Sequence, residues 1–202
     1  PRLPAHGDER AARVDGRSRD GERVDRAGEG DIQWENAFDR TVLVTVLGSC
    51  VAACVRDTVS GIGGMNHFML PGDGSDILSS SARYGVYAME KLVNELIKMG
   101  AKRSNLEAKL FGGGSVLRGF TVSNVGERNA DFALGYLRNE KIAVVAKDLL
   151  DIYPRKVYFF PNSGKVKVKQ LRNVHNDTII EREQAYKSRL RLSDLQGEVE
   201  LF

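Results

Sequence analysis

Two side chains in this sequence have the chemistry of a nucleophile and its base, and their spacing predicts that they lie side by side. The chain contains only two cysteines and three histidines. Cys50 and His67 lie in two short apolar runs on either side of a turn-forming spacer, a pattern typical of a β-hairpin. If Arg56 and Gly61 close a four-residue loop, Cys50 stands opposite His67. Directly opposed residues point to the same face with Cβ atoms roughly 5 Å apart.

A thiol beside an imidazole is suited to acyl transfer. A neighbouring imidazolium lowers the pKa of a cysteine from about 8.5, so that a thiolate exists at neutral pH. The same histidine then donates its proton to a leaving group. Gly48 precedes the cysteine and allows a close approach of substrate to the backbone. Backbone N–H groups near Ser49 and Cys50 are candidate oxyanion donors.

Other roles for these residues remain open at this point. A cysteine in a strand is often a small buried hydrophobe, and a histidine is often purely structural. Zinc is disfavoured because Cys50, Cys54 and His67 supply at most three ligands, against the four of a structural site. A Cys50–Cys54 disulfide is also disfavoured, since positions four apart on a strand lie roughly 13 Å apart. We expect two unbridged thiols, no metal, and a packing role for Cys54.

The elements that position these residues follow from apolar periodicity. Strands are predicted at residues 41–47, 50–56, 62–70, 106–111, 142–147, 156–160 and 165–171, the last two forming a hairpin. Helices are predicted at about residues 79–100 and 129–138, with Asn129 as a natural N-cap of the second. A further helix (178–190) and a short strand (198–202) are predicted in the tail. Strands dominate and are tightly connected, so the fold class is α+β, with helices packed on mostly antiparallel sheet layers.

Composition bounds the organisation of the chain. The 202 residues are 42% apolar and 28% charged, and 30 Lys and Arg oppose 27 Asp and Glu, a balance too even to indicate nucleic acid or an anionic membrane. Residues 1–30 lack aromatic side chains and contain seven arginines and seven acidic residues, a composition that predicts a disordered arm. Residues 31–171 form the predicted domain and residues 172–202 a C-terminal extension. Reduced cysteines and the lack of a long apolar run predict a cytoplasmic protein without direct membrane insertion.

Several motifs together resemble one known family. LGSCVAAC at residues 47–54 is followed by GIGGMNHFMLP at residues 61–71, then by FGGG at 111–114, NVGERN at 124–129 and the hairpin at 155–171. The combination closely resembles the chemoreceptor glutamine deamidase family (CheD) of bacterial chemotaxis. The resemblance covers roughly residues 41–171.

The resemblance implies a deamidase domain with a cysteine-hydrolase type fold and no cofactor. Its implied activity is that of a protein-glutamine glutaminase, an amidohydrolase that converts specific glutamines of methyl-accepting chemotaxis receptors to glutamate through a cysteine thioester. The resemblance also allows hydrolysis of glutamate methyl esters, because the same thioester intermediate would form. The partners implied are the cytoplasmic domains of those receptors and, in some bacteria, a chemotaxis phosphatase. An alternative role is therefore regulatory docking to that phosphatase. In a third hypothesis the chain is a different cysteine amidase, such as a toxin-like deamidase or a transglutaminase.

The resemblance also implies a threonine assisting the Cys–His pair, carried over here as Thr45. Family members often have this threonine six residues before the cysteine, where this chain has Val44. On one regular strand Val44 and Thr45 face opposite ways, so Thr45 is expected to need a bulge near Gly48, and Thr41 remains an alternative.

Further residues are candidates for substrate binding. They lie next to the cysteine, in the glycine motif and in the loop before the second helix: Ser49, Gly113, Gly114, Ser115, Asn124 and Arg128. For the glycine motif a simple strand-to-loop turn is an equal alternative. Asn124, Arg128 and Asn129 either contact substrate or cap the helix, and capping is favoured for Asn129.

Overall fold

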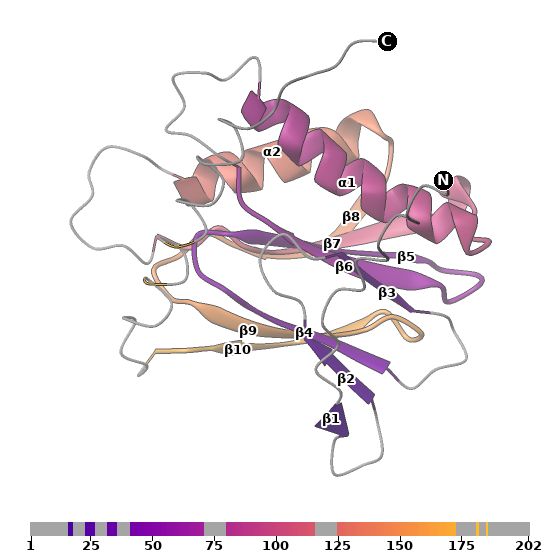
Figure 1. The fold of residues 1–202 in the computed structure, drawn as a ribbon, viewed down its shortest axis with the longest axis horizontal. Coiled ribbons are helices and arrows are strands. Elements are labelled where there is room, and N and C mark those ends of the chain that lie inside the picture. Colours follow the sequence, from indigo (N-terminus) through magenta and orange to yellow (C-terminus); the bar gives the residue numbers. More distant parts are fainter. Residues whose placement is uncertain are drawn as a thin grey trace, which may run out of the picture.

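Three layers build the fold: two stacked β-sheets and a pair of helices on the outer face of one sheet (Figure 1). The computed structural model describes residues 41–70, 80–115 and 125–172. It also describes the backbone of short strands at 16–17, 23–26 and 32–35, and single helical residues at 181 and 185. Within these ranges the predicted α+β class is confirmed.

Each sheet has five strands. The first has the order β1 (Gly16–Arg17), β2 (Arg23–Arg26), β4 (Thr41–Leu47), β9 (Arg155–Phe160) and β10 (Lys165–Gln170). The second has the order β3 (Ile32–Glu35), β6 (Gly63–Phe68), β5 (Val51–Asp57), β7 (Leu106–Gly112) and β8 (Ala143–Leu149). Helices α1 (Ser80–Lys98) and α2 (Val125–Asn139) cover the second sheet, and a 3₁₀ turn, η1 (Arg103–Asn105), precedes β7. Among these strands only the β2–β4 and β7–β8 pairs are parallel.

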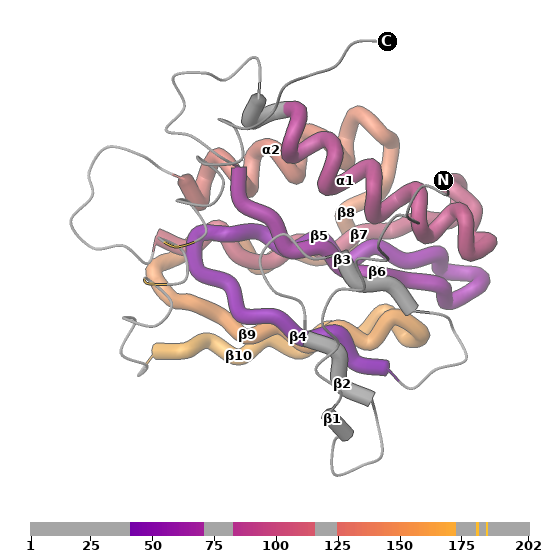
Figure 2. Tube along the Cα trace, viewed as in Figure 1, coloured from indigo at the N-terminus to yellow at the C-terminus, as the bar shows by residue number. Residues whose placement is uncertain are grey.

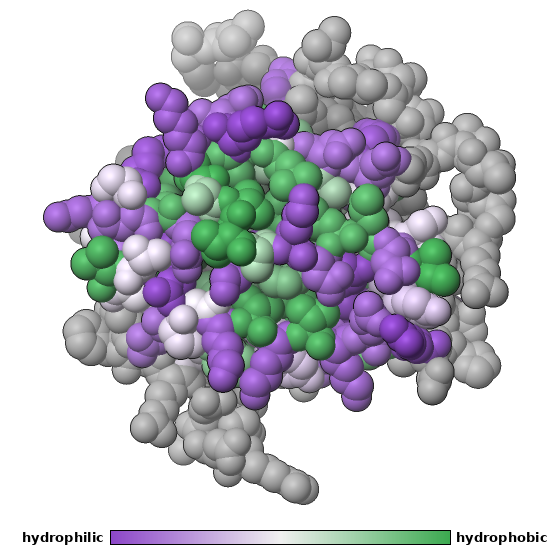
Figure 3. Space-filling model, turned by 180° about the vertical axis from the view of Figure 1, so that it is seen from behind, coloured by the Kyte–Doolittle hydropathy of each residue, from purple (hydrophilic) through white to green (hydrophobic). Residues whose placement is uncertain are grey.

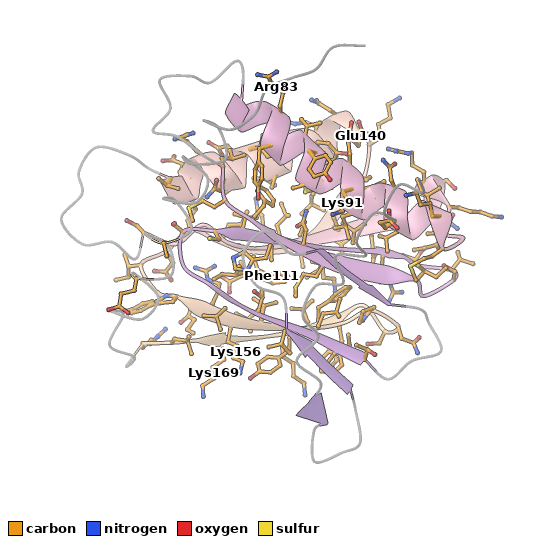
Figure 4. The ribbon with its side chains drawn as sticks, in the orientation of Figure 1. Arg83, Lys91, Phe111, Glu140, Lys156 and Lys169 are labelled. Atoms are coloured by element: carbon orange, nitrogen blue, oxygen red, sulfur yellow. The ribbon has the colours of Figure 1, made fainter. Side chains whose placement is uncertain are left out.

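Strand β5 is apolar on both faces because both are covered. Val51, Ala53 and Val55 pack toward α1 and α2 in one core cluster. Cys50, Ala52 and Cys54 belong to a second cluster, with apolar residues of β4 and β9. Phe111 of β7 belongs to this second cluster and lies between the two sheets in Figure 4. The two-residue period of the strand thus separates the helix-facing core from an inter-sheet core that contains both cysteines.

The β5–β6 hairpin forms as predicted, but its register differs by two residues. The pair that closes it is Arg56–Gly63 rather than Arg56–Gly61, so His67 stands opposite Ala52 instead of Cys50. The longer turn is held by Asp57, whose carboxylate accepts hydrogen bonds from the backbone N–H groups of Val59 and Ser60. Because the difference is two residues and not one, the side chains keep their faces.

Two short strands lie within residues 1–30, the segment whose composition predicts a disordered arm. Strand β2 pairs in parallel with β4, Arg23 with Thr41 through Arg26 with Val44, and β1 pairs with β2. Pairing through backbone groups at the edge of an existing sheet requires no apolar side chain, which is why composition does not reveal it. The tail helix and strand predicted at 178–190 and 198–202 lie almost wholly outside the described residues.

Some apolar surface remains outside the two cores. The reverse of the molecule shows apolar side chains gathered near its centre within a polar rim (Figure 3). Large exposed apolar side chains occur on β8 (Val145) and in the loop after it (Leu150 and Ile152). Within the described ranges, neither helix combines the length and apolar character needed to cross a membrane.

Candidate active site

The chain passes from one sheet to the other immediately before the cysteine. Strand β4 ends at Leu47 in the first sheet and β5 starts at Val51 in the second, so Gly48, Ser49 and Cys50 form the crossing (Figure 2). This crossing decides which way the preceding strand faces. Leu43 and Leu47 of β4 belong to the inter-sheet core, and Thr45 lies between them on the same side of the strand.

Thr45 therefore reaches the site without a bulge. Its Oγ1 lies 2.8 Å from Nδ1 of His67, and both side chains are only 3% exposed. The expected bulge presumed that one strand runs from Thr45 to Cys50, and that presumption is wrong because Thr45 lies on β4 and Cys50 directly precedes β5 in the facing sheet. Val44, the residue six before the cysteine, lies on the opposite face of β4. Thr41 begins β4 and so lies at the end of the strand farthest from the crossing.

Cys50 and His67 share the inter-sheet face of the hairpin. His67 is directly opposite Ala52, and Cys50 precedes Ala52 by two positions, which places thiol and imidazole as diagonal neighbours. Cys50 is 0% exposed and Ser49 is also buried. The Ser49 hydroxyl donates to the Met69 sulfur at 3.9 Å, so this side chain packs against the end of the hairpin.

The glycine motif after β7 supports the cysteine turn through its backbone. Gly113 N–H donates to the Cys50 carbonyl and Gly114 N–H to the Gly48 carbonyl, both at 2.7 Å. Gly112 has φ of +109°, and a Cβ there would lie 2.1 Å from the Cys50 carbonyl oxygen, so only glycine fits. Ser115 is exposed and donates its N–H to the Asp151 carbonyl. The motif thus holds the backbone of the Gly48–Cys50 turn on two sides.

Cys54 lies deeper on the same face and differs from Cys50 in its surroundings. It stands opposite Met65 and Lys109, and no disulfide joins the two cysteines. Burial raises the pKa of the Cys54 thiol well above its usual value, an effect that the charge of Lys109 opposes only in part. Among the described residues no group of three His, Cys, Asp or Glu side chains is arranged to hold a metal ion.

Comparison with known proteins decides the family. A family model described as CheD chemotactic sensory transduction matches residues 69–170. A protein named probable chemoreceptor glutamine deamidase CheD from Methylobacillus flagellatus is 63% identical over 165 residues, covering 80% of this chain and 81% of that protein. The chain belongs to the CheD family.

Other relatives are similar to the same degree. A protein of the same name from Thiobacillus denitrificans is 64% identical over 164 residues, covering 80% of this chain and 81% of that protein. One named probable chemoreceptor glutamine deamidase CheD 1 from Dechloromonas aromatica is 64% identical over 167 residues, covering 82% and 83%. Among solved structures, hypothetical protein YfiH of Bacillus licheniformis matches with a TM-score of 0.33 at 13% identity over 56% of this chain and 46% of that chain, too weak to bear on the fold.

One buried arginine of this CheD-family chain was not singled out by sequence reasoning. Arg155 is fully buried at the start of β9, opposite Leu47. Its guanidinium donates to the backbone carbonyls of Asp148 and Leu150 and forms a 2.8 Å ion pair with the Asp148 carboxylate. Burial lowers the pKa of Arg155, and the carboxylates of Asp148 and Asp151 oppose that shift. Arg155 fixes the loop in which Leu150 donates its N–H to the Gly112 carbonyl and the Asp151 carbonyl accepts from the Ser115 N–H.

The helix predicted to start at Asn129 starts earlier, and this changes the roles of its first residues. Because α2 begins at Val125, Asn129 lies one turn inside the helix and is not an N-cap. Its side chain instead bonds the backbone of Ser49 and of Leu70, on both sides of the site. Arg128 is half-buried in the first turn of α2, and Asn124 lies outside the described residues.

Proposed function

We propose that this chain hydrolyses glutamine side chains of chemoreceptor proteins to glutamate, with Cys50 as nucleophile and His67 as base. The observation that carries the proposal is the 2.8 Å contact between Thr45 Oγ1 and His67 Nδ1, on the face that also holds Cys50. Membership of the CheD family supports the substrate class, since relatives 63–64% identical carry the name chemoreceptor glutamine deamidase.

The contact supports different tasks for the two ring nitrogens of His67. With Nδ1–H donating to the Thr45 hydroxyl, the ring is held in one orientation and Nε2 exchanges protons with Cys50 and the leaving group. Thr45 also stabilises the imidazolium that forms when the thiol is deprotonated, because a hydrogen bond to a charged group is stronger than one to a neutral group.

The reaction proceeds by acyl transfer in two steps. The Cys50 thiolate attacks the carboxamide carbon to form a tetrahedral adduct; His67 then donates its proton to the departing nitrogen, and ammonia leaves behind a thioester. A water molecule that loses a proton to His67 attacks the thioester, which yields glutamate and restores the thiol. One water is consumed and one ammonia released per turnover, without a cofactor.

The oxyanion of both tetrahedral adducts requires a donor near the cysteine. The N–H groups of Gly113 and Gly114 already hold the carbonyls of Cys50 and Gly48. We therefore assign the donor role to the backbone N–H of Cys50 itself. Because the Cys50 side chain is fully buried, binding of the receptor must also expose it.

Mass spectrometry of a receptor cytoplasmic fragment tests the proposal. Incubation with the wild-type chain in H₂¹⁸O should convert specific glutamines to glutamates that carry one ¹⁸O, as hydrolysis of a thioester requires. Cys50→Ala should abolish the conversion, whereas Cys54→Ala, the matched control on the same strand face, should retain most of it. A regulatory docking role would survive Cys50→Ala, so a variant that is folded and still fully functional would refute the proposal.

A further inference from the structure

The amide side chain of Asn129 joins the two halves of the site. Asn129 is 0% exposed and projects from the second turn of α2. Its Nδ2 donates to the Ser49 carbonyl at 2.9 Å, and its Oδ1 accepts from the Leu70 N–H at 2.9 Å. One bond therefore holds the residue before the cysteine, and the other holds the strand end three residues after His67.

These two backbone groups occupy equivalent places in the hairpin. The last recorded β5–β6 pair is Val51–Phe68, and the same register continued outward would place Ser49 opposite Leu70. At that position Asn129 lies between the strands and bonds to both. An amide suits this place because it offers one acceptor and one donor in a single plane, whereas a carboxylate offers only acceptors.

The bond to Ser49 fixes a peptide plane that matters for catalysis. In a trans peptide the C=O and N–H point in opposite directions, and the Ser49 carbonyl belongs to the same peptide as the Cys50 N–H. The flanking carbonyls of Gly48 and Cys50 are held by Gly114 and Gly113. Asn129 is thus the side chain that holds the third consecutive carbonyl of the turn and, through it, sets the direction of the Cys50 N–H.

We propose that Asn129 is a positioning residue for the hydrolysis, which aims the Cys50 N–H at the oxyanion by holding the Ser49 carbonyl. The inference rests on the proposed function, because an oxyanion forms only if Cys50 attacks an acyl carbon. The inference predicts that loss of the Asn129 donor slows acyl transfer, because that reaction needs the oxyanion donor. Alkylation of the same thiol forms no oxyanion, so its rate should not change.

Asn129→Asp tests this prediction with little change in volume. The carboxylate keeps the acceptor for Leu70 N–H but loses the donor to Ser49. Removal of a whole oxyanion donor typically lowers kcat by about 10²- to 10³-fold, so a misdirected one should lower kcat on a receptor fragment by about 10- to 100-fold. KM should change by less than about twofold, since the group acts in the transition state. Alkylation of Cys50 by iodoacetamide, which is slow in both proteins because the thiol is buried, should stay within about twofold of the wild-type rate.

Low pH provides a rescue that a purely structural role would not show. In the Asn129→Asp variant, protonation of the introduced carboxylate restores one donor and one acceptor, and burial favours this neutral form. The ratio of Asn129→Asp to wild-type kcat should therefore rise as the pH is lowered from about 8 to about 5.5. Asn129→Ser, which is uncharged and too short to bridge both groups, should show the loss in kcat without the rescue.

Asp57→Asn serves as the matched control for stability. Asp57 is a buried side chain that also holds backbone N–H groups, but it lies at the far end of β5 from Cys50. The Asp57→Asn variant should have a lower melting temperature than wild type and an unchanged kcat. Wild-type kcat in both Asn129 variants, or alkylation of Cys50 that falls in parallel with kcat, would overturn the inference. Wild-type protein that fails to deamidate receptors would instead refute the proposed function.

Discussion

Replacement of Thr45 by valine removes one hydroxyl from the site and almost nothing else. Valine and threonine have nearly the same shape, so the packing of β4 against the second sheet should persist. What disappears is the contact between Oγ1 and Nδ1 of His67, 2.8 Å long and enclosed between two sheets. Thr45→Val therefore tests this hydrogen bond to the histidine.

The magnitude follows from burial and charge. A hydrogen bond to a charged group contributes about 1.5–3 kcal/mol. In the proposed mechanism, His67 becomes positively charged when it takes the proton of Cys50 or of water. Loss of the Thr45 hydrogen bond therefore destabilises mainly these charged states along the reaction. At about 1.4 kcal/mol per tenfold change in rate, kcat should fall by about 10- to 100-fold. Leaving Nδ1 without this bond should also lower the free energy of unfolding by about 1–3 kcal/mol.

Two matched variants make the test decisive. Thr45→Ser keeps the hydroxyl and should retain most of the kcat, with only the stability loss of a missing methyl group. Thr41→Val removes another hydroxyl from the same face of β4. The Thr41 hydroxyl is buried and has no hydrogen-bond partner among the described residues, so this variant should have a higher melting temperature and an unchanged kcat. Deamidation of a receptor fragment, followed by mass spectrometry, gives kcat for each variant. Equal activity of Thr45→Val and wild type, or an equal loss in Thr45→Ser, would refute the reasoning.

Three further outcomes are expected. Burial raises the pKa of Asp57, but hydrogen bonds from three backbone N–H groups outweigh burial and hold this pKa below its usual value. The contribution of Asp57 to stability is therefore complete above about pH 4 and is lost as the pH falls through the lowered folded-state pKa. Asp57→Asn should be about 1–3 kcal/mol less stable than wild type at neutral pH in urea titrations, with a difference that narrows in acid. Gly112→Ala should cost about 3 kcal/mol or more and reduce activity, because the new Cβ would meet the Cys50 carbonyl, and a stable, active variant would contradict the close approach. Gly135→Ala, in open space on α2, should instead stabilise the chain by about 0.5–1 kcal/mol in the same titration.

The site was predictable to the extent that it depends on strand periodicity. Cys50 and His67 were expected on one face of a hairpin, and they lie on one face because alternation fixes sidedness whatever the exact register. The register itself was not predictable, since Asp57 extends the turn by accepting hydrogen bonds from its own loop and from Lys102, which is distant in sequence. An error of two residues changes neighbours without changing faces.

Asn129 illustrates a different limit. Its residue type suits a helix N-cap, and a local pattern offered no reason to move the helix start to Val125. Its bonds to Ser49 and Leu70 join segments 80 and 59 residues away in the chain, respectively. No short-range pattern encodes such partners, because they exist only once α2 has packed on the second sheet.

The sequence by itself determined strands β4 to β10, the existence of the two helices and the hairpin, and the common face of thiol and imidazole, since each depends on the spacing of apolar and turn-forming residues over a few positions. The resemblance implied a role for Thr45, but only the tertiary structure decided that its hydroxyl faces His67. Its direction depends on the crossing at Gly48 and Ser49, which places β4 and β5 in separate sheets facing one another. On a single strand Thr45 would point away from Cys50; across two stacked sheets the same side chain points inward, where its hydroxyl meets His67.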